Sequence, residues 1–178
     1  MLKFQLPDGS IREYPQGTTG QQFAESISPR LAQQAIGIKL NDKIVDLNRP
    51  LQESGEIRVI TPNNEDDDAL FLLRHSCAHV LAEAVCDLFP GTQLAYGPPI
   101  ENGFYYDLAT PKPLSEDDFS LIEKRMAEII AADLPFVRCD TDIPEAMRRT
   151  ERDKYKRDNA ERAIERARVA GEEPVISF

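Results

Sequence analysis

Residues 66–89 are the feature that most constrains the fold. This stretch contains neither glycine nor proline, and Pro90 follows it. Because aspartate is a favoured N-cap and proline ends a helix, we predict one long helix, capped by Asp67 or Asp68 and stopped at Pro90. At about 100° per residue, seven apolar side chains fall on one stripe about 100° wide. We expect that stripe to face the core; it comprises Leu70, Leu73, Cys77, Val80, Leu81, Ala84 and Leu88.

The only two histidines of the chain lie four residues apart in this helix, at positions 75 and 79. Side chains at that spacing share a face and lie one turn apart. The face is roughly opposite the predicted core stripe, yet its other members are Leu72, Ala82 and Cys86 rather than charged residues. Since a solvated helix face is normally charged, we expect His75 and His79 to line a second wall or a cleft.

Length and charge narrow the class of protein. The chain has 178 residues, enough for one domain or two small ones, and 41% of them are hydrophobic. Acids outnumber bases by 31 to 21, which argues against self-sufficient binding to a phosphate backbone. Residues 1–61 are balanced, with seven acids and seven bases. Residues 148–168 hold nine bases and five acids; this patch is either a solvated helix face or a phosphate-facing surface.

The cellular compartment is indicated by three further features. The three cysteines have no spacing typical of a disulfide framework, which favours a reducing compartment. The N-terminus turns polar at once, so we expect no signal peptide. The longest uninterrupted apolar run, Ala69–Leu73, is too short to span a membrane. We therefore expect a soluble cytoplasmic protein.

The N-terminal region predicts a β-grasp, or ubiquitin-like, module. Alternation of apolar and polar residues indicates strands, and Pro7–Ser10 has the composition of a tight turn. The predicted elements, in the order β-β-α-β-β-β, are strands 2–6 and 11–14, a helix over 20–27, and strands 36–40, 43–46 and 57–60. A linker rich in Asn and Asp follows, and we place one domain at residues 1–62 and a second at 63–178.

The second domain predicts an α+β fold. Gly97-Pro98-Pro99 and Asn102-Gly103 are turns whose backbone can approach a ligand, and an aromatic strand over 104–108 follows them. Ser115 caps a helix over 116–133, with Phe119, Ile122, Met126 and Ile129 or Ile130 as its stripe. The remaining predicted elements are a strand over 135–139, helices beginning at 143 and 157, and the beginning of a strand over 173–178 with no partner strand after it.

The histidine pair leaves three readings open. Histidines at this spacing form half of a metal site, but zinc needs a third protein ligand. Cys77 points away with the core stripe, Cys86 lies about 10 Å further along the helix, and Cys139 stays possible. A metalloprotease would need Glu where Ser76 stands. The other two readings are buried structural histidines and a functional pair in a cleft that positions a water.

The order of these motifs resembles the N-terminal half of bacterial-type threonyl-tRNA synthetases. The resemblance rests on the β-grasp module, His75-Ser76-Cys77-Ala78-His79, the run from Tyr96 to Asp107, and Tyr155-Lys156. It covers essentially the whole chain and implies a TGS domain followed by an editing domain. The implied activity is hydrolysis of serine wrongly esterified to threonine tRNA in an enzyme that ligates threonine to tRNA using ATP. A missing methyl group supplies only about 1–3 kcal/mol of discrimination, so the synthetic site needs such a second site.

The resemblance also implies roles for five residues. His75 and His79 would position the attacking water and the ester, and Lys156 would contact the terminal ribose or the developing oxyanion. Gly97 and Tyr106 would shape the serine pocket. The implied partners are tRNA and the rest of the synthetase, with a homodimeric full enzyme, a monomeric piece and no membrane. No cofactor is implied here, because ATP, Mg²⁺ and Zn²⁺ belong to the catalytic domain of the family.

The chain departs from the family at one point. The family continues with an Asp-x-Cys-x-x-x-His segment, which is absent from this sequence, so we expect a piece truncated before that segment with slow or no hydrolysis of its own. Two other functions stay open. One is a non-catalytic module that binds tRNA or protein, and the other is a zinc-dependent aminoacyl-tRNA deacylase.

Overall fold

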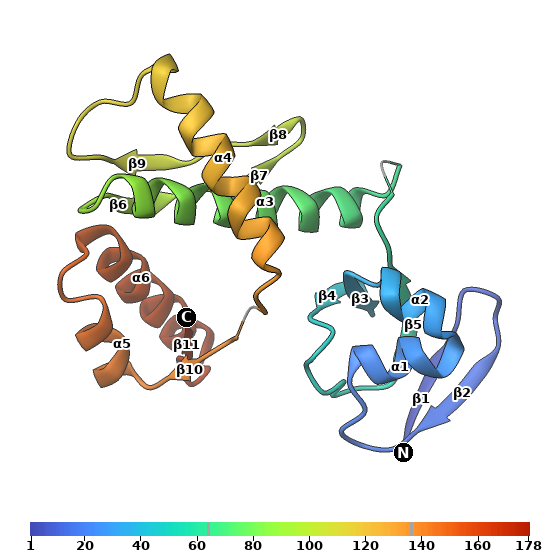
Figure 1. The fold of residues 1–178 in the computed structure, drawn as a ribbon. Coiled ribbons are helices and arrows are strands. Elements are labelled where there is room, and N and C mark those ends of the chain that lie inside the picture. The colour runs from blue at the N-terminus through green and yellow to red at the C-terminus, as the bar shows by residue number, and fades with distance from the viewer. Residues whose placement is uncertain (64, 136) are drawn as a thin grey trace. The chain divides into compact units, whose positions relative to one another are not determined.

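The computed structural model describes residues 1–63, 65–135 and 137–178, and Figure 1 shows the path of the chain. Contacts divide it into two compact units, Met1–Ser76 and Cys77–Phe178. The long helix α3 (Asp67–Leu88) contributes its first ten residues to the first unit and the rest to the second. The domain division after residue 62 therefore stays a prediction, because residues 67–76 pack with the first unit.

The first unit is a five-stranded mixed sheet with helices, in the strand order β2-β1-β5-β3-β4 (Figure 1). The β1–β5 pair is parallel, and the other neighbours are antiparallel. Its elements are β1 (Leu2–Gln5), β2 (Ile11–Tyr14), α1 (Gly20–Ile27), α2 (Pro29–Gln34), β3 (Gly37–Leu40), β4 (Lys43–Val45) and β5 (Gly55–Ile60). The predicted β-grasp module is confirmed, with α2 as an additional short helix.

Alternation along the strands builds the core of this unit. Leu2 and Phe4 of β1 point inward between exposed neighbours, as expected for a strand with one buried face. Phe23 of α1 packs on them, and its ring lies 5.7 Å from that of Phe4 in an edge-on arrangement. Thr19 and Gln22 form a reciprocal capping box at the start of α1. One face of the sheet is therefore covered by α1.

The second unit is a set of helices with three short antiparallel strand pairs. Its elements after α3 are β6 (Gln93–Tyr96), β7 (Pro99–Ile100), β8 (Gly103–Phe104), β9 (Asp107–Ala109), α4 (Glu116–Ala132), β10 (Asp140–Thr141), α5 (Ile143–Arg149), α6 (Lys154–Ala170) and β11 (Ile176–Ser177). The pairs are β6–β9, β7–β8 and β10–β11. The coarse α+β class is therefore present, and its assignment to an editing-domain type stays a proposal.

Three local predictions for this unit need correction. The aromatic strand over 104–108 is split into β8 and β9, because Tyr105 and Tyr106 leave the extended ladder. The strand over 135–139 is displaced to β10, while its position 136 lies outside the described residues. The final strand is present as β11, and its partner β10 precedes it in the chain. Helix α6 begins at Lys154 rather than Arg157.

Helix α3 has nearly the predicted bounds but a different cap and a different buried side. Asp66, not Asp67 or Asp68, caps it, because its Oδ1 accepts hydrogen bonds from the backbone N–H of Asp68 and Ala69 at 3.0 and 3.3 Å. The predicted core stripe is only partly right, since Leu73 is 41% exposed while Ala84 is fully buried. A second buried stripe runs along Ala78, Ala82, Val85 and Phe89. Small alanines allow close packing on this second side.

The C-terminal half of α3 packs against α4. Ala84, Val85 and Phe89 form one buried cluster with Ile122 of α4, joined by the partly buried Met126 and Ile129. Phe119, which we expected on the same stripe, is exposed, and of the alternatives Ile129 and Ile130 it is Ile129 that packs here while Ile130 is exposed. By length and composition alone, α3 is apolar enough to cross a membrane: one 18-residue window has a mean hydropathy of 1.3, and 28% of that window is buried. The core helix of a soluble protein meets the same two criteria.

Candidate functional site

Both histidines are exposed on α3. Their spacing puts them on one face of the helix, and Cys86 lies further along the same face. The ring of Phe71, one turn before His75, lies 5.9 Å from the imidazole in a tilted arrangement. The imidazoles are therefore accessible to solvent, and the reading of buried structural histidines does not fit this structure.

Gly97 and Tyr106 are in direct contact. Gly97 directly follows β6, and Tyr106 directly precedes β9, which pairs with β6. A Cβ built on Gly97 would lie only 2.4 Å from Cδ2 of Tyr106 and 2.7 Å from Cγ, so glycine is the residue that fits. Burial raises the pKa of Tyr106 above its usual value, with smaller contributions from Cys86 and Asp153, so its hydroxyl stays protonated at neutral pH.

Lys156 lies in the first turn of α6, where Asp153 is the cap. The Oδ1 of Asp153 accepts hydrogen bonds from the backbone N–H of Tyr155 and Lys156 at 3.1 and 3.0 Å. Burial raises the pKa of the Cys86 thiol, and the positive charge of Lys156 opposes that shift. This coupling places the ammonium group of Lys156 in the electrostatic neighbourhood of Cys86.

Within the second unit, the structure brings two predicted site residues, Gly97 and Tyr106, into contact. The positive charge of Lys156 acts to lower the pKa of Cys86, and Cys86 in turn acts to raise the pKa of Tyr106. His79 lies seven residues before Cys86 on the same helix face, about 10 Å along the axis. His75 belongs to the first unit.

Two residues near this region were absent from the sequence-based set. Cys86 was excluded as a metal ligand, but its half-buried thiol lies among the predicted residues. Asp153 was missed because the helix was expected to begin later. Its signal was the aspartate directly before a run of helix-forming residues, which is typical of an N-cap.

A groove of about 970 Å³ lies beside these residues in the second unit. Ala95 and Tyr96 of β6 form one side, and one face of α6, including Tyr155, Arg162 and Arg166, forms the other. Asn159 Nδ2 donates a hydrogen bond to the carbonyl oxygen of Ala95 at 3.0 Å, which holds α6 beside β6. Tyr96 is 60% exposed and Tyr155 is 37% exposed. Aromatic rings and guanidinium groups in an open groove suit unstacked nucleotide bases.

No metal centre is found among the residues that the structure describes, because no three His, Cys, Asp or Glu side chains come close enough to hold an ion. Cys139, the open third ligand, instead accepts a hydrogen bond from Arg149 at 3.4 Å. The donor set among the described residues does not fit zinc.

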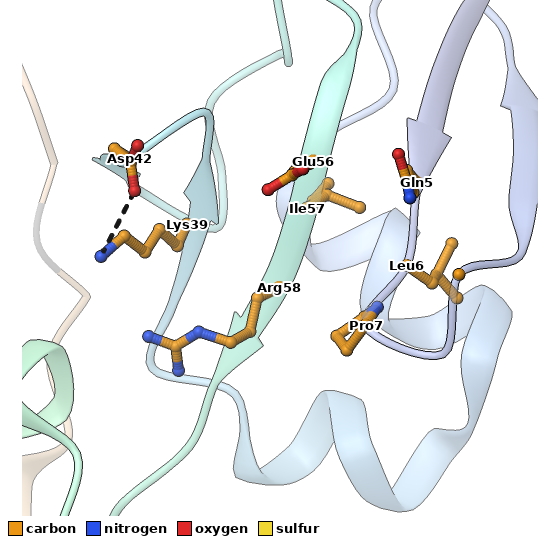
Figure 2. A pocket seen from close by; sticks show the side chains of 9 residues that line it. Gln5, Leu6, Pro7, Lys39, Asp42, Glu56, Ile57 and Arg58 are labelled. Atoms are coloured by element: carbon orange, nitrogen blue, oxygen red, sulfur yellow. Dashed lines mark ion pairs between the residues drawn. The ribbon is translucent and has the colours of Figure 1, made fainter.

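A second hollow, of about 430 Å³, lies on the β-grasp sheet (Figure 2). Lys39 of β3 and Arg58 of β5 are its cations, and Asp42 and Glu56 are its acids. Lys39 pairs with Asp42 at 4.0 Å and with Asp68 at 2.9 Å, while Arg58 pairs with Asp66 and Asp68. Because these cations already have carboxylate partners, the hollow is a poor cradle for phosphate.

Comparison with known proteins gives two findings. Residues 2–61 match the TGS domain family. The chain is also 51% identical over 137 residues to a threonine–tRNA ligase of Brucella canis and 50% identical over 133 residues to one of Rhodopseudomonas palustris. A third, from Phenylobacterium zucineum, is 46% identical over 148 residues.

These matches cover 77%, 75% and 83% of this chain, but only 20%, 20% and 22% of the three relatives. The chain therefore spans about a fifth of the length of the relatives it matches. The matched lengths extend well past the TGS domain, so the similarity includes the histidine helix and part of the second unit.

Proposed function

We propose that this chain, a homologue of the N-terminal part of threonine–tRNA ligases, carries residues of a site that hydrolyses serine wrongly esterified to the tRNA of such an enzyme. The observation that carries the proposal is the contact of Gly97 with Tyr106, in the same compact unit as Lys156, Cys86 and the exposed His79. The whole-protein expectations belong to the same proposal: a cytoplasmic homodimer whose ATP, Mg²⁺ and Zn²⁺ are bound by another domain.

The chemistry asked of these side chains is modest. An aminoacyl ester is already labile, so orienting a water and removing its proton can supply the required rate. His79, with His75 one turn before it, would take that proton as a neutral imidazole. The ammonium of Lys156 would stabilise negative charge on the ester oxygen as it develops.

Selectivity would come from steric exclusion. Threonine has one methyl group more than serine, and a pocket gains or loses only about 1–3 kcal/mol from one such group. Gly97 and Tyr106 are already in contact, so the wall that they form would have little room to yield. A rigid wall can turn a small difference in size into a clash, so this pocket would admit serine and reject threonine.

The test is hydrolysis of tRNA carrying serine or threonine by the full-length ligase and by residues 1–178. We expect the full-length enzyme to hydrolyse the serine ester and spare the threonine ester, and the shorter chain to be slow or inactive. Equal hydrolysis of both esters by the full-length enzyme would contradict the proposal.

A second candidate function, a non-catalytic RNA-binding module, is favoured by the groove between β6 and α6. Tyr96 and Tyr155 offer exposed rings there, and Arg166 adds a guanidinium group. Binding of uncharged tRNA that weakens on substitution of Tyr96 and Tyr155, with no hydrolysis in the full-length enzyme, would favour this function over the first.

A further inference from the structure

The N-terminal turn of α3 is attached to the β-grasp sheet by a cluster of four charged side chains. Lys39 and Arg58 are direct cross-strand partners on β3 and β5, and Figure 2 shows their side chains extending to the same side. Two like charges in that relation destabilise a sheet unless acids neutralise them. The acids come from α3 and its cap, since Arg58 binds Asp66 and Asp68 and Lys39 binds Asp68 at 2.9 Å.

The cluster is partly sheltered from solvent. The side chains of Asp66 and Asp68 are 20% and 21% exposed, and that of Arg58 is 37% exposed. Asp66 has two tasks at once, because its carboxylate both binds Arg58 and caps the helix. The cap of α3 is therefore built from residues of the sheet as well as of the helix.

The same face of α3 also makes a steric contact with the sheet. A Cβ built on Gly37 of β3 would lie 2.8 Å from Cδ1 of Leu72, so Leu72 packs directly over this glycine. Counting about 100° per residue, Asp68, Leu72 and His75 follow one another along a single face of the helix. The sheet therefore contacts the residues one and two turns before the first imidazole.

We propose that Arg58 and Gly37 are positioning residues for His75: together they fix the rotation of α3 about its axis, and with it the direction of the imidazole. A helix end held by one charge could still roll. Here Asp68 and Leu72 lie on one face and both contact the sheet, and the cap residue Asp66 is ion-paired to Arg58 as well, so the helix cannot roll without breaking contacts. The catalytic consequence of this inference rests on the proposed function, but the placement of His75 does not.

The test uses the 178-residue chain with two variants. Arg58→Gln removes the ion pairs, and Gly37→Val pushes Leu72 away. The readouts are the NMR resonance of the His75 ring and the exchange rates of the amides over residues 67–76. We expect both variants to shift the His75 resonance and to raise exchange in the first turn about tenfold, the scale of a lost helix cap.

Two control variants separate positioning from a general loss of stability. Lys3→Gln removes an exposed ion pair with Glu13 on the same sheet, and Ile57→Val weakens the core of the unit. Neither should move the His75 resonance. An unchanged His75 resonance in both test variants, or an equal shift in the controls, would overturn the inference.

In the full-length ligase, Arg58→Gln should lower kcat for hydrolysis of the serine ester while KM for the tRNA and threonine ligation stay unchanged. Because the NMR readouts need no substrate, the two proposals fail separately. A shifted His75 resonance with no hydrolysis in the wild-type enzyme would support the positioning role and reject the proposed function. If the wild-type enzyme hydrolyses the ester but Arg58→Gln changes neither the His75 resonance nor kcat, the proposed function would stand and the positioning role would be rejected.

Discussion

The ring of Tyr106 occupies the space that a β-carbon on Gly97 would need, with Cδ2 only 2.4 Å from that position. Gly97 lies after β6 and Tyr106 before β9, so the pairing of these two strands holds the contact in place. The glycine is required here by close approach, and the tyrosine owes its raised pKa chiefly to burial. This contact is the most sharply defined part of the candidate site.

Gly97→Ala should therefore displace Tyr106. Overpacking of this kind costs about 1–3 kcal/mol of unfolding free energy. The full-length ligase should also lose hydrolysis of the serine ester, because the wall of the pocket moves. Urea denaturation of the 178-residue chain measures the first effect.

The control is a double-mutant cycle. In a Tyr106→Ala background the space is empty, so Gly97→Ala should cost close to nothing. A full cost in that background would mean that Gly97 is required for another reason.

Asp153→Ala should shorten α6 at its start. The side chain accepts two backbone hydrogen bonds there, and loss of such a cap costs about 0.5–2 kcal/mol. Asp158→Ala is the matched control, because its exposed ion pair with Arg162 should contribute less than about 1 kcal/mol. Equal losses in denaturation for the two variants would contradict the assigned cap.

The reactivity of Cys86 reports on the position of Lys156 without any substrate. Burial raises the pKa of the thiol and Lys156 opposes it, so Lys156→Gln should slow alkylation of Cys86 at pH 7–8. The decrease should be less than about tenfold, because one exposed charge shifts a neighbouring pKa by under one unit. Lys154 lies two residues earlier on α6, and Lys154→Gln should leave the rate of alkylation unchanged. An unaltered rate in Lys156→Gln would separate Lys156 from this region.

The attachment of α3 to the β-grasp sheet should weaken in acid. The hydrogen bond from Arg58 holds the pKa of Asp66 below its ordinary value of 3.8. A lowered pKa in the folded state means that the stabilisation is present above pH 3.8 and is lost as the pH falls through the folded-state pKa. Asp66→Asn should thus be less stable than wild type at pH 6, and the difference should shrink below pH 3.8. A constant difference across that range would contradict the ion pair.

Local pattern predicted much of this fold. The alternation of apolar and polar residues from Leu2 to Leu6, followed by a helix over 20–27, identified the β-grasp module. The absence of glycine and proline from residues 66–89 predicted the bounds of α3 to within a few residues. The helix predicted to begin at Ile143 does so, as α5. In these segments the local preference and the tertiary packing agree.

The errors arose where packing overrides local pattern. A single apolar stripe predicts one buried side, but α3 is covered on two sides, and small Ala78 and Ala82 carry little hydrophobic signal. The cap fell on Asp66, whose carboxylate also pairs with Arg58, eight residues earlier in the chain. Tyrosine is a residue type that favours strands, but Tyr106 packs against Gly97 and lies outside the strand ladder. Long-range partners of this kind cannot be found from spacing along one chain.

The histidine pair supplies the most direct test of the proposed hydrolysis. Both side chains are exposed, so His75→Ala and His79→Ala should each change the unfolding free energy by less than about 0.5 kcal/mol. The decisive measurement is the single-turnover rate of hydrolysis of serine-charged threonine tRNA by the full-length ligase carrying each variant. We predict a loss of about 10²–10⁴-fold, the usual contribution of a positioned general base, with threonine ligation unchanged. Full hydrolysis by both variants would contradict the account.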